Sequence, residues 1–175
     1  MLFIQYFAKL IKILRSAASP SQIAGGFILG MLIGLSPSLI SLTNLILVLL
    51  LIILNVNLAT ALFSFAVFSG IAYLIDPLSH SLGYFLLVGL DDLREFWISL
   101  YNAPLTPYTF FNNTVVLGSL IIALVLLIPM YFLVKTGIIK YREKYEPRVQ
   151  NWKWMKMMKS TLIYKWYERL KFLGD

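Results

Sequence analysis

One long uncharged block dominates the hydrophobic pattern of the chain. From Ser16 to Ile75 the sequence contains no Asp, Glu, Lys, Arg or His. In a chain of 175 residues such a block leaves no polar face for water, so it predicts membrane segments rather than a soluble core. The pattern predicts an all-α integral membrane protein with about four transmembrane or re-entrant helices. These helices are expected at 22–35, 39–54, 58–75 and 115–134.

The first two segments are short and are separated by Ser36 and Pro37. Segment 22–35 would form a helix of roughly 21 Å, whereas the hydrocarbon core of a bilayer is about 30 Å thick. Serine at an N-cap and proline at the first helical position are typical of a helix start. The pair therefore predicts that one helix ends and the next begins here, which makes 22–35 and 39–54 either two short spans or a re-entrant hairpin.

Asparagine and proline mark the ends of the third segment. Asn55 and Asn57 predict a turn before 58–75. The α conformation is unfavourable for a residue that precedes proline, so Asp76 and Pro77 predict the end of this helix. Asp76 would then be the N-cap of another helix that begins at Pro77.

Two apolar stretches follow in the second half of the chain. The stretch 79–90 is too short to cross a membrane, so it is expected either to re-enter or to pack on the other helices. The stretch 115–134 is long enough for a complete span, with a kink expected at Pro129.

The region between these stretches, 91–113, contains a predicted amphipathic helix on the outer membrane surface. It is expected at 91–102, because Asp92 and Glu95 have the spacing of a capping box. The apolar residues Leu93, Phe96, Trp97, Leu100 and Tyr101 would share one face of this helix.

Both ends of the chain combine basic and aromatic residues with apolar ones. Residues 1–18 are expected to form a basic amphipathic helix at the membrane interface, or simply the cytoplasmic lead into the first span. Residues 138–173 are expected to form interfacial helices on an anionic leaflet; nucleic-acid binding is the competing interpretation, which the apolar surface of this tail disfavours. The residues expected at lipid headgroups or at the interface are Lys9, Lys12, Arg15, Trp97, Trp152, Lys153, Trp154, Lys156, Lys159 and Trp166.

The charges predict how the chain is oriented. Charged residues make up 13% of the chain, about half of the quarter that is usual for soluble domains. Most Lys and Arg residues lie before Pro20 or from Lys135 onward, and Arg94 is the one basic residue between them. By the positive-inside rule, both termini are cytoplasmic and the acidic middle is external. Two cytoplasmic ends require an even number of crossings.

Three glycines at a spacing of four residues lie in the first segment. Gly26, Gly30 and Gly34 would share one helix face, and such a face allows another helix backbone to approach closely in lipid. A phosphate-binding loop would need a lysine or a preceding soluble strand, and neither is present. We therefore interpret the glycines as a helix-packing surface rather than a nucleotide site, with a glycine-lined path for a lipid or an ion as the alternative.

Five polar residues in or beside the apolar segments are candidate membrane contacts. A hydrogen bond between helices explains Asn44, and a turn explains Asn55 and Asn57. Contact with a polar substrate is the alternative for all three. Asp76 and His80 lie one helical turn apart, and an ionisable residue at a membrane edge is a functional candidate. An N-cap role for Asp76 is the simpler explanation.

The chain contains few residues of the types that commonly carry out catalysis. It contains no cysteine and a single histidine, and no metal-binding or nucleophile–base pattern is recognisable. The stretch from Asp91 to Glu95 has some likeness to the aspartate-rich motif of prenyl-transferring enzymes, but it occurs once, in a chain too short for that fold. We therefore expect no enzyme activity, no cofactor and no metal site.

The run from Ser19 to Leu87 resembles a bacterial membrane family known as a domain of unknown function. The pattern is P-x-x-I-A-x-G-x-x-x-G-x-x-x-G-x-x-P, followed by an Asn, an Asn/Asp-Pro-Leu motif and a glycine, and the resemblance covers residues 9–90. Asp76 stands where that family often has Asn. The matching positions are Pro20, Ile23, Ala24, Gly26, Gly30, Gly34, Pro37, Asn57, Pro77 and Gly83. The resemblance implies a small inner-membrane protein, sometimes joined to glycosyltransferases or encoded near envelope proteins.

These observations lead to one main functional hypothesis and two alternatives. The main hypothesis is a non-catalytic subunit of an envelope complex that engages phospholipid, for lipid transport or membrane organisation, together with a larger membrane or periplasmic protein. Short segments favour it, because mismatch is relieved by thinning of the bilayer or by association, including oligomerisation. The alternatives are a self-contained channel or small transporter, and an assembly scaffold for a membrane enzyme such as a glycosyltransferase. No nucleic-acid partner is expected.

Overall fold

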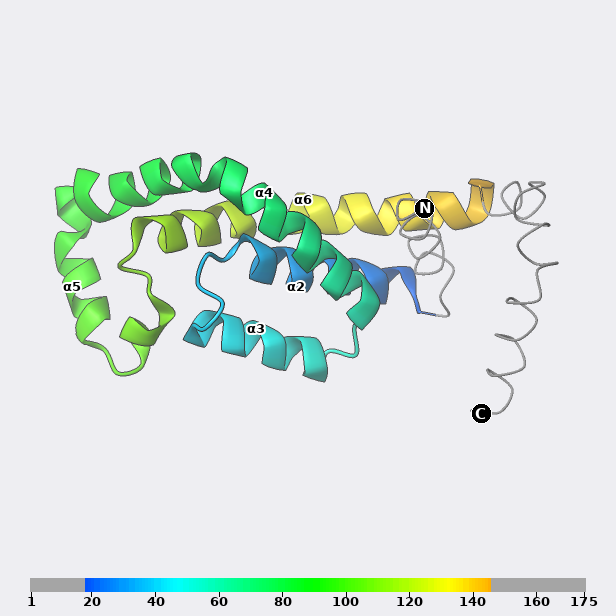
Figure 1. Cartoon of the computed structure of the whole chain (residues 1–175), viewed down its shortest axis with the longest axis horizontal. Coiled ribbons are helices and arrows are strands. Elements are labelled where there is room, and N and C mark those ends of the chain that lie inside the picture. Colours follow the sequence, from blue (N-terminus) through cyan, green and yellow to red (C-terminus); the bar gives the residue numbers. More distant parts are fainter. Residues whose placement is uncertain (1–17, 146–175) are drawn as a thin grey trace. The chain divides into compact units, whose positions relative to one another are not determined.

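A computed structural model describes residues 18–145, and these residues form helices and turns without a β-strand (Figure 1). The prediction of an all-α fold is therefore confirmed for this part of the chain. The α-helices are α2 (Pro20–Leu35), α3 (Leu42–Ile53), α4 (Leu58–Tyr84), α5 (Arg94–Asn102) and α6 (Thr114–Lys140). Short π- and 3₁₀-helical segments are η1 (Phe85–Gly89), η2 (Asp91–Leu93), η3 (Thr106–Thr109) and η4 (Tyr141–Tyr145).

The chain divides into two compact units at Thr136. In the second unit, the described residues form the last turn of α6 and η4, which carry Lys140, Arg142 and Lys144. Of the expected interfacial helices at 1–18 and 138–173, residues 1–17 and 146–173 lie outside the described residues, and 138–145 continue α6 and form η4.

Helix α2 begins at a serine–proline pair. Ser19 is the N-cap, its Oγ accepts a hydrogen bond from the backbone N–H of Gln22 at 3.2 Å, and its own N–H donates to Oε1 of Gln22 at 2.8 Å. Pro20 occupies the first turn, where its missing N–H costs nothing. This capping box fixes the start of α2 two residues before the predicted segment.

The prediction that Ser36 and Pro37 begin the second helix is wrong. Ser36 is the C-cap of α2, and residues 36–41 form a loop. The cap of α3 is Ser41, whose Oγ accepts from the backbone N–H of Asn44 at 3.2 Å. A serine is therefore the N-cap in both helices, but Ser36 lacks the glutamine three residues later that completes the cap at Ser19.

The predicted end of the third segment at Asp76 and Pro77 is also wrong. Helix α4 starts at its N-cap Asn57, contains Pro77 in its interior, and continues through η1 to Gly89. Asp76 is therefore not an N-cap, and 79–90 is not a separate segment. Beyond the proline, Ser81 Oγ donates to the carbonyl of Pro77 at 2.9 Å, and the helix is supported by its contact with α6.

The predicted surface helix at 91–102 is present as η2 and α5, but its capping box is not. The N-cap of α5 is Leu93, and no side chain caps it or η2, so the roles expected for Asp92 and Glu95 are wrong. The last predicted segment is longer than expected, since α6 begins at Thr114 and extends to Lys140 with Pro129 inside it.

Helix α2 is the centre of the first unit. It is apolar on all sides, and most of its residues are buried, as expected for a helix without a polar face. Its residues form one core with Phe68 of α4 and Ala123 of α6, and Phe27 meets Phe68 edge to face at 5.8 Å between ring centroids. Contacts join α2 to both α3 and α4, as Figure 1 shows.

Glycines allow α2 to lie directly against the backbone of α4. A Cβ added at Gly26 or at Gly30 would overlap the carbonyl oxygens of Asn57 and Ala61, respectively, and one added at Gly34 would lie 2.7 Å from that of Phe65. The contacts advance by four residues on both helices in the same direction, so α2 and α4 are parallel. The backbone N–H of Asn57 also donates to the carbonyl of Gln22 at 3.1 Å, which joins the starts of the two helices.

A second close contact joins α4 to α6, and on α4 it lies beyond Pro77. A Cβ at Gly83 would overlap the carbonyl oxygen of Thr114, and a Cβ at Gly118 would overlap that of Ser79. The pairs run in opposite directions, so α4 and α6 are antiparallel at this point. Small residues are four positions apart in both helices, Ser79 and Gly83 in α4 and Thr114 and Gly118 in α6. This arrangement permits close approach of the two backbones.

Candidate functional site

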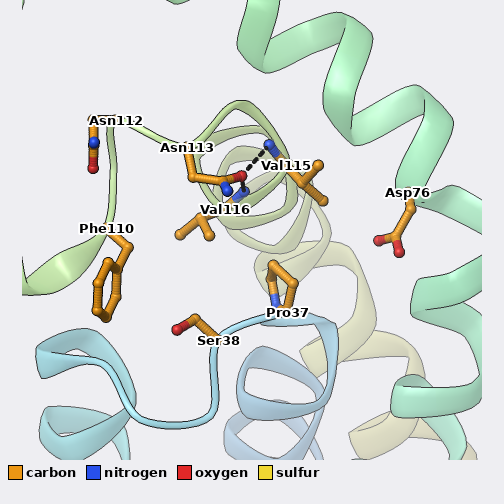
Figure 2. A pocket seen from close by; sticks show the side chains of 8 residues that line it. All are labelled: Pro37, Ser38, Asp76, Phe110, Asn112, Asn113, Val115 and Val116. Atoms are coloured by element: carbon orange, nitrogen blue, oxygen red, sulfur yellow. Dashed lines mark hydrogen bonds between the residues drawn. The ribbon is translucent and has the colours of Figure 1, made fainter.

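A hollow lies where three segments of the described chain meet. It has a volume of about 460 Å³ and lies between the loop 36–41, α4 and the segment that leads into α6 (Figure 2). Its lining residues are Pro37, Ser38, Asp76, Phe110, Asn112, Asn113, Val115 and Val116.

The loop side of the hollow is held in position by Asn44. This residue is 2% exposed, and its Nδ2 donates to the carbonyl of Ser38 at 2.8 Å. Ser36 Oγ donates weakly to the same carbonyl at 3.4 Å. Because α3 carries the asparagine that binds the loop before it, the position of Ser38 is fixed by the helix that follows.

The α6 side is fixed by Asn113. Its Oδ1 accepts from the backbone N–H groups of Val115 at 2.9 Å and Val116 at 3.3 Å, as drawn in Figure 2. Its own N–H donates to the carbonyl of Phe110, which has a left-handed backbone with φ 58°. Asn113 therefore caps α6 and leaves its Nδ2 as a donor near the hollow.

Asp76 supplies the charge of the hollow. It lies inside α4 and is half-buried, and within residues 18–145 its carboxylate makes no hydrogen bond or ion pair. In Figure 2 it stands across the hollow from Phe110, with Pro37 and Ser38 on a third side. None of the described lining residues is basic, so the Asp76 carboxylate has no compensating cation among them.

A small cavity of about 20 Å³ lies next to Asn44, on the inner side of the same loop. Its lining includes Ser36, Thr43, Asn44 and Ser119, and the Oδ1 of Asn44 is buried without a partner there. A cavity of this size holds one water molecule. A water in it would satisfy the amide oxygen, since a buried polar atom without a partner is costly.

The remaining polar candidates lie elsewhere. Asn55 has a left-handed backbone with φ 48° in the turn before α4, and Asn57 caps α4, accepting from the N–H and Oγ1 of Thr60 at 2.9 and 2.8 Å. Both are at the opposite end of α2 from the loop 36–41. The structure therefore places Asn57 apart from Asp76 and Asn44.

His80 belongs to the contact between α4 and α6 rather than to the lining of the hollow. Its Nδ1 lies 2.7 Å from Oγ1 of Thr114, within hydrogen-bonding distance. Trp97 of α5 donates from Nε1 to the carbonyl of Leu86 at 2.8 Å and stacks on Phe111 at 5.9 Å between ring centroids. The other residues expected at the membrane interface (Lys9, Lys12, Arg15, Trp152, Lys153, Trp154, Lys156, Lys159 and Trp166) lie outside the described residues.

Within residues 18–145, no group of three or more His, Cys, Asp or Glu side chains could hold a metal ion. Five of the eight lining residues come from the segment 110–116, which sequence reasoning did not connect with Asp76. The one available signal is the pair Asn112 and Asn113, directly before the last apolar helix, where asparagine is typical of an N-cap.

The chain matches the model of a known protein family. The model of a family described as uncharacterized proteins conserved in bacteria (DUF2062) matches residues 5–146. The chain belongs to this family. The resemblance to a bacterial family of unknown function is thus confirmed, and the DUF2062 match reaches beyond the residues 9–90 on which it was based, so that it includes α6. No curated protein and no solved structure matches the chain.

Proposed function

We propose that this DUF2062 protein is a non-catalytic, multi-pass protein of the bacterial inner membrane that engages phospholipid together with a larger membrane or periplasmic partner. The observation that carries the proposal is the contrast between two long apolar helices and two short ones in one bundle. The stretches Leu58–Gly89 and Thr114–Lys144 are long and apolar enough to cross a membrane. The short helices are α2 and α3.

Exposed apolar surface supports a lipid environment. Helix α3 is apolar on nearly all sides, and a helix of this kind normally lies inside a protein. Yet Asn44 is the one buried residue of α3, and Ile52 is 71% exposed. Soluble proteins seldom leave such a surface open, whereas hydrocarbon chains cover it without cost. In α4 and α6, the side chains of Leu74 and Val125 are similarly exposed.

The lengths of the helices support local thinning of the bilayer. With 12 residues, α3 is about 18 Å long, and α2 with 16 residues is about 24 Å. Both values are below the thickness of about 30 Å that a hydrocarbon core has. We propose that α2 and α3 cross as two short spans beside α4 and α6, so that the lipid next to α3 is compressed.

The orientation of the spans follows from charge and direction. With a cytoplasmic N-terminus, α2 and the parallel α4 run outward, while α3 and the antiparallel α6 run back. The loop 36–41 and the hollow at Asp76 would then face the outer side, and the basic residues from Lys135 onward would be cytoplasmic. Lipid headgroups of the outer leaflet would meet the hollow directly.

A gentle-detergent purification of the full chain tests this proposal. The tagged protein is isolated from bacterial membranes, and mass spectrometry identifies the phospholipids and proteins that remain bound, with a tagged inner-membrane protein of similar size as control. We expect several phospholipid molecules per chain that survive extensive washing, together with one larger membrane or periplasmic protein. The proposal would be contradicted if the protein retained neither phospholipid nor a specific partner above the level of the control.

A further inference from the structure

The hollow at Asp76 has a chemistry that selects among phospholipid headgroups. Among its described lining residues, Asp76 supplies a carboxylate, and Ser38, Asn112 and Asn113 add uncharged polar groups. No described lining residue is basic. Such a site attracts a cation that carries hydrogen-bond donors and repels a group that is purely anionic.

Two backbone donors on the α6 side of the hollow are already in use. The backbone N–H groups of Val115 and Val116 both donate to Oδ1 of Asn113. The other donors of the described lining are the uncharged side chains of Ser38, Asn112 and Asn113, so a phosphate would meet no cation there. The Asp76 carboxylate, in contrast, has no partner within residues 18–145. An ammonium group, with three donors and no acceptor, is the complementary ligand.

Apolar surroundings indicate that the cation belongs to an amphiphile. Pro37, Phe110 and Val116 line the same hollow, and the loop residues next to Ser38 are strongly exposed, with Leu39 at 61% and Ile40 at 93%. A ligand with its head in the hollow would have exposed apolar residues nearby, because Leu39 and Ile40 directly follow Ser38 and lead into α3. A soluble amine would gain nothing from these contacts.

We propose that the hollow binds the primary ammonium headgroup of an aminophospholipid, such as phosphatidylethanolamine, with Asp76 as its counter-ion. The acyl chains extend along Leu39, Ile40 and the exposed side of α3. This inference rests on the proposed function, because it requires that the outer end of the helices meets lipid. It adds the identity of the headgroup and the residue that selects it.

Native mass spectrometry with defined lipids tests the assignment. The full chain is exchanged into an equimolar mixture of phosphatidylethanolamine, phosphatidylglycerol and phosphatidylcholine, for the wild type, for Asp76→Asn and for Asp92→Asn. Asp92 is an exposed acid on η2 that does not line the hollow, so its variant is a matched control. Elution volume and helix content establish that each variant is folded.

We expect the wild type and Asp92→Asn to bind phosphatidylethanolamine several-fold above its share of the mixture, and Asp76→Asn to lose at least 80% of this enrichment while still binding lipid. Equal binding of all three lipids by the wild type, or unchanged enrichment in Asp76→Asn, would overturn the headgroup assignment and leave the proposed function intact. Absence of any retained phospholipid would overturn both. Displacement of the lipid by an equal concentration of soluble glycerophosphoethanolamine would also overturn the assignment, since the ligand would then be a free amine.

Discussion

Gly30→Ala is expected to destabilise the protein more than a glycine-to-alanine substitution at any other position of α2. The new Cβ would overlap the carbonyl oxygen of Ala61 and lie within 3 Å of two further backbone atoms of that residue. Backbone atoms cannot move aside as a flexible side chain can, so α2 and α4 must separate along the contact. We expect a loss of about 3 kcal/mol in the free energy of unfolding, at the upper end of the usual cost of overpacking. Unfolding of the purified protein in mixed micelles, followed by circular dichroism, measures it.

Gly70→Ala is the matched control on α4. A Cβ at Gly70 meets no atom within 4 Å. Because alanine is favoured over glycine inside a helix by about 1 kcal/mol, this variant is expected to be as stable as the wild type or slightly more so. The two substitutions are chemically identical and have opposite expected signs. A Gly30→Ala protein as stable as Gly70→Ala would contradict the close packing of α2 on α4.

Gly118→Ala is expected to be similarly harmful, because it disrupts the separate contact between α4 and α6. Its Cβ would overlap the carbonyl oxygen of Ser79, two residues after Pro77 in α4. The expected loss is about 2–3 kcal/mol, measured by the same unfolding experiment. Gly137→Ala is the control on α6, where a Cβ meets nothing within 4 Å.

A double-variant comparison shows whether these losses come from the proposed contacts. Gly83 and Gly118 belong to one contact, so the two alanine variants should be less than additive: once the first Cβ has separated α4 from α6, the second costs little. Gly30→Ala combined with Gly118→Ala should be close to additive, because the two glycines lie in different contacts. Full additivity of Gly83→Ala and Gly118→Ala would show that they do not share a contact.

Helix existence could be predicted from the sequence, whereas helix ends depended on details that residue type alone does not determine. The chain has Ser-Pro at Ser19 and again at Ser36, and the second pair was expected to start a helix. The first pair does so, because Gln22 completes a capping box with Ser19. The second has no such partner, and the loop continues to Ser41. The spacing to a glutamine distinguishes the two.

Tertiary contacts overrode local preference at Asp76 and Pro77. Proline disfavours the helix on its N-terminal side, and the sequence alone gives no reason for the helix to continue. Ser79 and Gly83, beyond the proline, pack on Gly118 and the backbone of Thr114. That contact exists only in the folded bundle, which also tolerates proline inside apolar helices.

The hollow could be predicted only in part. Asp76 was recognisable because an acid in an apolar stretch is unusual, and Pro37 because it breaks the first pair of helices. Its other wall comes from residues 110–116, which are brought to Asp76 by the antiparallel pairing of α4 and α6. Periodicity does not reveal which helices are neighbours, so this part of the site required the fold.

The most direct test of the proposed short spans is cysteine labelling from the two sides of the membrane. The chain has no native cysteine, so Ser38→Cys, Ile46→Cys and Asn55→Cys each give a single reactive position without further changes. A membrane-impermeant maleimide is applied to spheroplasts and to inside-out vesicles. We expect Ser38→Cys to react from the outer side and Asn55→Cys from the cytoplasmic side, while Ile46→Cys, exposed in the middle of α3, should react from neither. Protection of Ser38→Cys from the outer reagent, or reaction of Ser38→Cys and Asn55→Cys from the same side, would contradict the proposed short spans.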